Sequence, residues 1–166
     1  MSMTFTEIQN EVIDKYCIKI EERSKCYGRM HAHVRERKIC KWHPKASVQC
    51  TFDLFHEIGH IETTKSWMRR AEEEYYATCW AIDRCKEYKI DIPKSVLHVY
   101  QRYVLLEVAR GLRRGGNGYA YEGMNLYKYA GIEKTIQEFL DELEPGWRPY
   151  IVDSIKKYDE QLMKGE

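Results

Sequence analysis

The feature that most constrains this chain is the pentapeptide HEIGH at residues 56–60, because it lies inside a stretch with a helical pattern. Ser47 can cap the start of that helix, which we expect to run to about Thr63. Residues four apart on a helix lie on the same face, so His56 and His60 can direct two imidazoles at one ion. The chain must therefore fold so that further ligands meet this face.

The order of residues in the pentapeptide fits a catalytic zinc site. Three protein ligands leave one coordination position for water, whose pKa falls to about 7. Glu57 follows the first histidine at the edge of the same face, where its carboxylate can take a proton from that water as it attacks a carbonyl group, and later pass it to a leaving amine. The alternative is a surface helix with two unrelated histidines, but the capped, amphipathic context favours a metal site.

The glycine of the pentapeptide supports this interpretation. Glycine inside a helix costs about 1 kcal/mol relative to alanine, so Gly59 needs a structural reason. We expect close packing against a neighbouring backbone beside the site.

The third ligand is expected from the helix that follows. One face of that helix carries small residues suited to close packing, and it contains a single acid: Ala71, Glu74, Ala77, Thr78, Ala81 and Cys85. An acid on such a face needs a partner, and zinc would be one. Glu74 is therefore the first candidate and Glu73 the next. Glu62 lies at the end of the motif helix, and Glu72 fits a solvated acidic patch.

The HEIGH motif together with EYYATCWA at residues 74–81 resembles the ImmA/IrrE family of zinc metallopeptidases, which are common in phages and mobile elements. That family shows HExGH, then a helix with a glutamate, an alanine three residues later and an aromatic–alanine pair. The resemblance covers about residues 25–88. It implies that His56, His60 and Glu74 hold zinc.

The resemblance also implies a function. Zinc-dependent hydrolysis of peptide bonds is expected, with Glu57 as general base and a regulatory protein such as a phage repressor as substrate. The alternative is a zinc-binding module that sequesters such a protein without cleaving it. Two features depart from the family: Thr78 stands where Asn or Asp often orients a ligand histidine, and residues 82–93 are longer and more charged than the usual Leu-Leu-x-Pro ending.

The order of elements predicts an α+β class, a mostly helical domain that the resemblance makes zincin-like. Residues 26–42 alternate as a β-hairpin with a charged turn at 35–37, and we expect this hairpin to pack beside the motif helix. We expect a single domain over 1–166, with its core at about 25–90 and a helical half at 94–163. The other expected helices are 6–22, 67–89 with Ser66 as its cap, 93–110, 131–142 and 149–163.

The hairpin contains further metal-binding residue types. His31 and His33 share one face of the expected strand, and Cys40 and His43 have a C-x-x-H spacing. These four residues would make a second zinc site, although a polar strand face with a turn histidine is the favoured interpretation. The same hairpin can instead offer an edge strand to an extended peptide.

The later helices contain weaker candidates. His98 can donate to the oxyanion of a tetrahedral intermediate, but a lone helical histidine is more often partly buried and hydrogen-bonded. Arg110, Arg113 and Arg114 adjoin a glycine-rich loop at 113–118 and can bind a phosphate or a carboxylate. A solvated helix end, where cations favour the helix dipole, is the preferred interpretation.

Composition excludes several function classes. A formal net charge of +1 and the lack of a basic helix-turn-helix argue against nucleic acid as a partner. No apolar run approaches the roughly 20 residues of a membrane helix, and the N-terminus lacks a signal-peptide pattern. The six cysteines are scattered, so we expect reduced, mostly buried thiols. The expected location is the cytoplasm of a bacterial host, with the protein encoded by a phage or prophage.

Overall fold

The structure is a computed structural model, and it describes residues 3–21, 30–40, 42–114, 124–134, 138 and 149. The described residues include five helices and three short strands, so the predicted α+β class with a mostly helical content is confirmed. The chain forms two compact units: residues 1–68 with 76–96, and residues 69–75 with 97–166.

Helix α1 (Phe5–Lys15) opens the first unit with a capping box. The Thr4 hydroxyl accepts a hydrogen bond from the Glu7 backbone at 3.3 Å, and the Glu7 carboxylate accepts one from the Thr4 backbone at 2.7 Å. The helix ends well before the predicted residue 22. Cys17 adopts a φ of 52°, a left-handed conformation that breaks the helix, and the chain continues as a strand.

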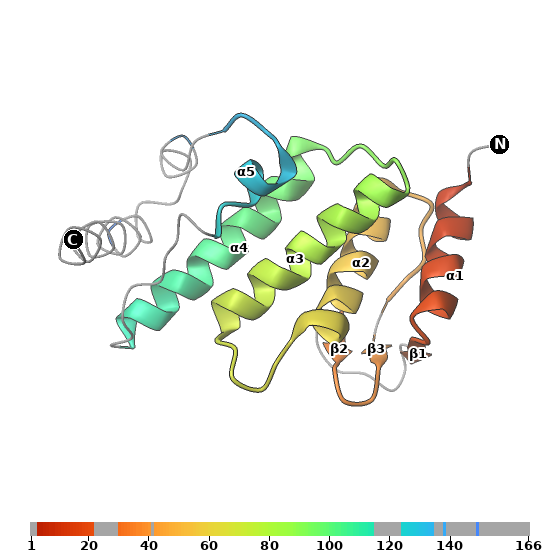
Figure 1. Cartoon of the computed structure of the whole chain (residues 1–166), viewed down its shortest axis with the longest axis horizontal. Coiled ribbons are helices and arrows are strands. Elements are labelled where there is room, and N and C mark those ends of the chain that lie inside the picture. The colour runs from red at the N-terminus through yellow and green to blue at the C-terminus, as the bar shows by residue number, and fades with distance from the viewer. Residues whose placement is uncertain are drawn as a thin grey trace. The chain divides into compact units, whose positions relative to one another are not determined.

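That strand, β1 (Lys19–Glu21), belongs to a small sheet with strand order β1-β3-β2. β2 (His31–His33) and β3 (Lys38–Cys40) pair antiparallel, which confirms the predicted hairpin. β1 pairs with β3 in parallel, a long-range pairing that the sequence pattern did not predict. β2 contacts the motif helix, so the sheet lies beside that helix as expected (Figure 1).

Helix α2 (Val48–Thr63) carries the HEIGH motif and has the predicted bounds. The Ser47 hydroxyl accepts a hydrogen bond from the Cys50 backbone at 3.2 Å, which confirms the predicted cap. One side of α2 supplies fully buried apolar residues to the first unit: Phe52, Leu54, Phe55 and Ile58. The motif is therefore held on a helix anchored by the core.

Helix α3 (Arg70–Glu87) starts three residues later than predicted. Ser66 and Trp67 lie in a turn, so the prediction of Ser66 as its cap is wrong. The Glu72 carboxylate instead accepts a hydrogen bond from the Arg69 backbone at 2.9 Å, just before the helix begins. All six residues of the predicted small-residue face are buried: Ala71, Glu74, Ala77, Thr78, Ala81 and Cys85.

Helices α4 (Lys94–Arg113) and α5 (Leu126–Ala130) belong to the second unit. The sequence pattern missed α5, which Asn125 caps at one end and Gly131 ends with a φ of 73°. The predicted helix start at Gly131 is therefore wrong, and most of the expected helices at 131–142 and 149–163 lies outside the described residues. Within the described part of the chain, no helix is long and apolar enough to cross a membrane.

Candidate metal centre

Helix α2 presents two imidazoles that face each other. The Nε2 atoms of His56 and His60 lie 3.1 Å apart, and the two side chains are 5% and 7% exposed. Two nitrogen ligands at the zinc–nitrogen distance of 2.0–2.1 Å in a tetrahedral site are about 3.3 Å apart. The observed separation therefore fits two ligands of one tetrahedral ion.

Thr78 holds one of these rings from helix α3. Its hydroxyl oxygen lies 3.1 Å from Nδ1 of His56, and the threonine is fully buried. When the other ring nitrogen of a histidine is hydrogen-bonded, the tautomer and the ring orientation are fixed. The resemblance expects an orienting residue at the position of Thr78, and the Thr78 hydroxyl contacts His56.

Gly59 allows α2 and α3 to approach closely at this point. A Cβ atom at residue 59 would lie 2.4 Å from the carbonyl oxygen of Ala77 and 2.9 Å from its Cα. These distances are far below van der Waals contact, so only glycine fits. The predicted reason for a glycine inside the helix, a neighbouring backbone, is confirmed.

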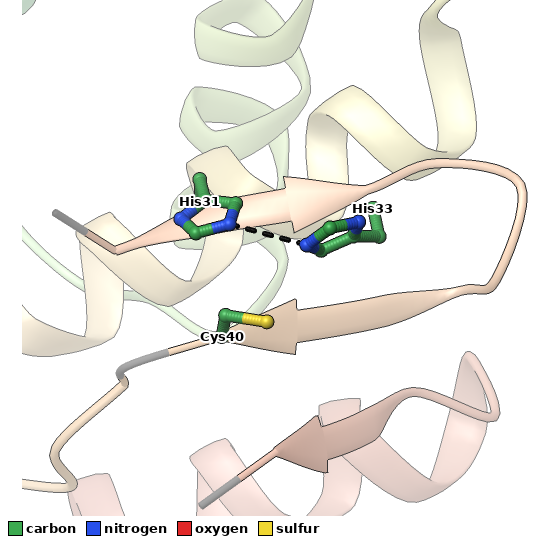
Figure 2. Close-up of side chains that lie close together, drawn as sticks. All are labelled: His31, His33 and Cys40. Atoms are coloured by element: carbon green, nitrogen blue, oxygen red, sulfur yellow. Dashed lines mark hydrogen bonds between the residues drawn. The ribbon is translucent and has the colours of Figure 1, made fainter. Parts of the chain in front are cut away.

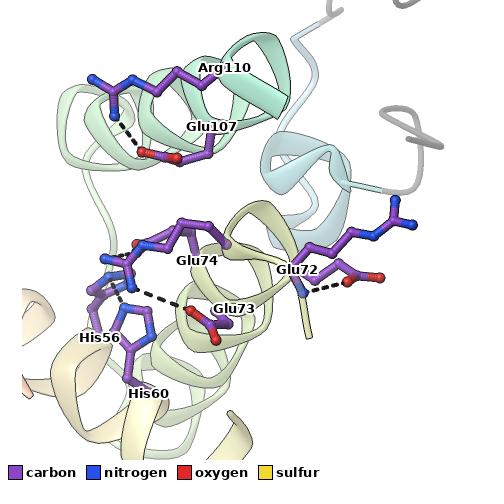
Figure 3. Close-up of polar contacts among 9 residues, drawn as sticks. His56, His60, Glu72, Glu73, Glu74, Glu107 and Arg110 are labelled. Atoms are coloured by element: carbon purple, nitrogen blue, oxygen red, sulfur yellow. Dashed lines mark hydrogen bonds and ion pairs between the residues drawn. The ribbon is translucent and has the colours of Figure 1, made fainter. Parts of the chain in front are cut away.

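Glu74 lies one helical turn before Thr78 on α3 and brings a carboxylate to the histidines. One ligand atom from each of His56, His60 and Glu74 can be chosen so that all three lie within 4.8 Å of one another. Glu74 is 1% exposed. Figure 3 draws Glu74 with the two imidazoles and with the neighbouring acids Glu72 and Glu73 of α3.

The competing acids have other partners. Glu62 pairs with Arg37, Glu72 accepts from the Arg69 backbone, and Glu73 lies 3.3 Å from the Arg70 guanidinium. Among the described residues, none of these three acids joins the group formed by the two histidines. The structure thus brings together the three residues that helical phase placed first.

Arg70 is a member of the site that sequence reasoning missed. Its Nη2 atom lies 2.6 Å from Oε1 of Glu74, four residues along the same helix. Burial lowers the pKa of Arg70, but the charge of Glu74 and a hydrogen bond with Tyr103 outweigh it, and the net pKa is raised. A buried carboxylate needs such a countercharge. The i,i+4 spacing of the pair was a readable signal.

The donor set fits zinc. Two histidines and one glutamate are a ligand set of open zinc sites, in which a fourth position remains for water. A carboxylate has two oxygens, so pairing with Arg70 does not use up the ligand capacity of Glu74. Glu57, beside the first histidine on α2, is half-buried and is not itself in the ligand group.

Cys85 shares the buried face of α3 but is a poor ligand. Burial raises the pKa of its thiol to about 12, so the thiol stays protonated at neutral pH, and thiolate is the form that binds metals. Three of the five described cysteines are buried: Cys40, Cys79 and Cys85. This agrees with the expectation of mostly buried thiols.

The weaker candidates lie on α4. Nδ1 of His98 is 2.8 Å from the hydroxyl of the buried Tyr127, the partly buried and hydrogen-bonded state given above as the alternative. Its catalytic role remains a prediction. The Arg110 guanidinium pairs with the buried Glu107, three residues earlier on the same helix, a partner that the sequence analysis also missed (Figure 3).

Comparison with known proteins gives no relative: no family model, no curated protein and no solved structure matches this chain. The centre is therefore identified from its own geometry. That geometry consists of two facing imidazoles, a buried carboxylate and a threonine that holds one ring.

Proposed function

We propose that this protein is a zinc-dependent metallopeptidase in which His56, His60 and Glu74 hold the metal. The convergence of these three buried side chains is the observation that carries the proposal. The resemblance of HEIGH and residues 74–81 to the ImmA/IrrE pattern supports it from the sequence. When bound, zinc acidifies water and polarises a carbonyl group.

Glu57 is the general base in this proposal. Its place next to His56 on α2 puts a carboxylate at the edge of the ligand face. That carboxylate takes the proton of the attacking water and returns it to the nitrogen of the leaving amine. Thr78 holds the His56 ring in orientation, and Arg70 balances the charge of Glu74 when no metal is present.

The proposed substrate is a protein or peptide in the bacterial cytoplasm. The resemblance to a family common in phages favours a regulatory protein of a phage or prophage, such as a repressor. A module that binds such a protein without cleaving it is the competing function, and the variants below separate the two.

Metal analysis tests the ligand set. We expect Glu74→Ala to bind one zinc fewer per chain than the wild type, because a buried ligand is lost. Glu73→Ala is the matched control, since this neighbouring acid pairs with Arg70, lies outside the ligand group and should keep the full zinc content. Equal zinc in the wild type and Glu74→Ala would move the third ligand elsewhere.

Peptide cleavage tests the reaction. Incubation with a peptide library, analysed by mass spectrometry, should show metal-dependent cleavage by the wild type. Glu57→Gln should keep its zinc and lose activity by a factor of about 10²–10⁴, the usual contribution of a general base. Asp53→Asn, one turn earlier on α2, should cleave normally. If Glu57→Gln retains the full biological effect with zinc bound, the peptidase mechanism is wrong.

A further inference from the structure

The small sheet gathers a second set of metal-binding side chains in one row. The register pairs His31 of β2 with Cys40 of β3, and Cys40 with Glu21 of β1. Directly paired residues point to the same face of a sheet, and so do residues two apart on one strand. His33 therefore shares this face with His31. In Figure 2 the two histidines and Cys40 lie on the same side of the hairpin.

The distances are those of a ligand group. The Nε2 atoms of His31 and His33 lie 3.1 Å apart, the same separation as between those of His56 and His60. One ligand atom from each of His31, His33 and Cys40 can be chosen within 4.8 Å of the others. The Cys40 thiol is buried and donates a hydrogen bond to Oε2 of Glu21 at 3.0 Å.

We propose that His31, His33 and Cys40 form a second metal site, distinct from the centre on α2 and α3, that takes zinc or a similar borderline-soft divalent metal. Two imidazoles and a thiolate select such metals over magnesium or calcium, which prefer oxygen ligands. Binding replaces the proton on Sγ of Cys40 by the metal, and that proton leaves to solvent. The carboxylate of Glu21 lies at hydrogen-bond distance from the same sulfur.

This site keeps three of the four residues that the sequence analysis grouped as a possible second zinc site, and it leaves out His43. Among the described residues, the group includes Cys40 but not His43. The backbone carbonyl of His43 instead accepts a hydrogen bond from Cys50, and its side chain is exposed. Strand register, not proximity in sequence, selects the partners of Cys40.

The histidines of this site are accessible, and the charges beside it are paired. Lys38 Nζ lies 3.0 Å from Oε2 of Glu21 and 2.8 Å from Oε2 of Glu36, so these carboxylates are held at the sheet by a cation. The two histidines are partly exposed, which leaves a path from solvent to the ligand atoms. A metal here would tie β2 to β3, and β2 contacts α2. Its role is therefore structural support of the sheet beside the motif helix.

Cobalt substitution tests this site separately from the centre on α2. Cobalt bound by a thiolate shows a sulfur-to-metal charge-transfer absorption in the near ultraviolet, which nitrogen and oxygen ligands do not produce. The full-length wild type, kept reduced with a non-thiol reductant, should develop this band on titration with Co²⁺. The ligand set of His56, His60 and Glu74 contains no sulfur, so failure of the peptidase proposal would leave the band unchanged.

Variants identify the ligands. Cys40→Ser and His33→Asn should lose the band at cobalt concentrations that saturate the wild type. Loss of a residue that only orients a ligand lowers metal affinity by about 10–100-fold. These variants remove a ligand itself, so zinc affinity at this site should fall by more than that. His33 is half-exposed, so its variant keeps the test valid even if Cys40→Ser fails to fold.

Matched controls are available on the same part of the chain. His43→Asn and Cys17→Ser alter exposed residues outside the group and should retain the band. Absence of the band in the wild type would overturn the proposal. So would a band that survives both Cys40→Ser and His33→Asn, or one that is lost in His43→Asn.

Discussion

Two pairs of histidines in this molecule face each other in the same way but are built on different elements. His56 and His60 are four residues apart on helix α2, whereas His31 and His33 are two residues apart on strand β2. In both pairs the Nε2 atoms lie 3.1 Å apart. The repeat of a helix is 3.6 residues and that of a strand is two, so different sequence spacings produce the same pairing.

The surroundings of the two pairs differ. The pair on α2, the helix-borne pair, is buried and has a carboxylate as its third donor. The pair on β2, the strand-borne pair, is partly exposed and has a thiol as its third donor. Charges act more strongly in a buried site, which suits hydrolytic chemistry. A thiolate site on the face of a small sheet suits structural binding. Element type therefore sets the spacing, while burial and the third donor set the chemistry.

The largest expected effect is the stabilisation of the folded protein by zinc bound at the helix-borne pair. In Cys40→Ser, which isolates this pair, zinc at about 1,000 times its Kd should raise the free energy of unfolding by about 4 kcal/mol. Adding Glu74→Gln should abolish that increment, and adding Glu73→Gln should not. Denaturant unfolding with and without zinc measures the difference. An equal increment in both double variants would contradict the assignment of Glu74.

Gly59→Ala should damage the helix-borne pair and spare the strand-borne pair. Its Cβ would lie 2.4 Å from the Ala77 carbonyl oxygen, so the helices must separate, at a cost of about 1–3 kcal/mol in stability. Zinc affinity at the helix-borne pair should fall with it. Thermal unfolding and zinc titration measure both quantities.

Gly131→Ala is the control for Gly59→Ala. A Cβ at residue 131 meets nothing within 4 Å, and only the φ of 73° is unfavourable, at about 1–2 kcal/mol. Stability should fall without any change in zinc affinity. Loss of zinc affinity in this control would mean that global destabilisation, not helix separation, weakens the site.

Thr78→Val should weaken metal binding more gently. It removes the hydroxyl 3.1 Å from Nδ1 of His56 while keeping the side-chain shape, so zinc affinity should fall by about tenfold at the helix-borne pair. Thr78→Ser retains the hydroxyl and should bind zinc nearly as tightly as the wild type. Competition with a chromophoric chelator measures both. Equal loss in the two variants would point to packing instead of ring orientation.

The smallest expected effect concerns the cap of the helix that carries the motif. Ser47→Ala removes the side chain that accepts from the Cys50 backbone and should cost about 1 kcal/mol in stability. Ser66→Ala changes an exposed turn residue and should stay within about 0.5 kcal/mol. Denaturant unfolding compares the two. A larger cost for Ser66→Ala would restore the predicted cap of α3.

Local features of the fold were predictable, and long-range ones were not. The Ser47 cap, the bounds of α2 and the buried face of α3 follow from interactions within one element. The sequence analysis predicted residues 19–21, which form β1, as the end of a helix, because so short a segment fits the helical period as well as the strand period. The left-handed conformation of Cys17 ends the helix before this strand begins. The pairing of β1 with β3 depends on residues about twenty positions apart, for which the chain carries no local signal.

By itself, the sequence determined that His56 and His60 share a face and that Glu74 is the acid on the small-residue face of the next helix. Both follow from helical phase, which needs no partner. Only the tertiary structure decided that Glu74, and none of its neighbouring acids, joins the histidines, at a place where Gly59 leaves room for the Ala77 backbone. Strand register likewise places Cys40 beside His31 and His33, whereas the exposed His43 lies outside their group.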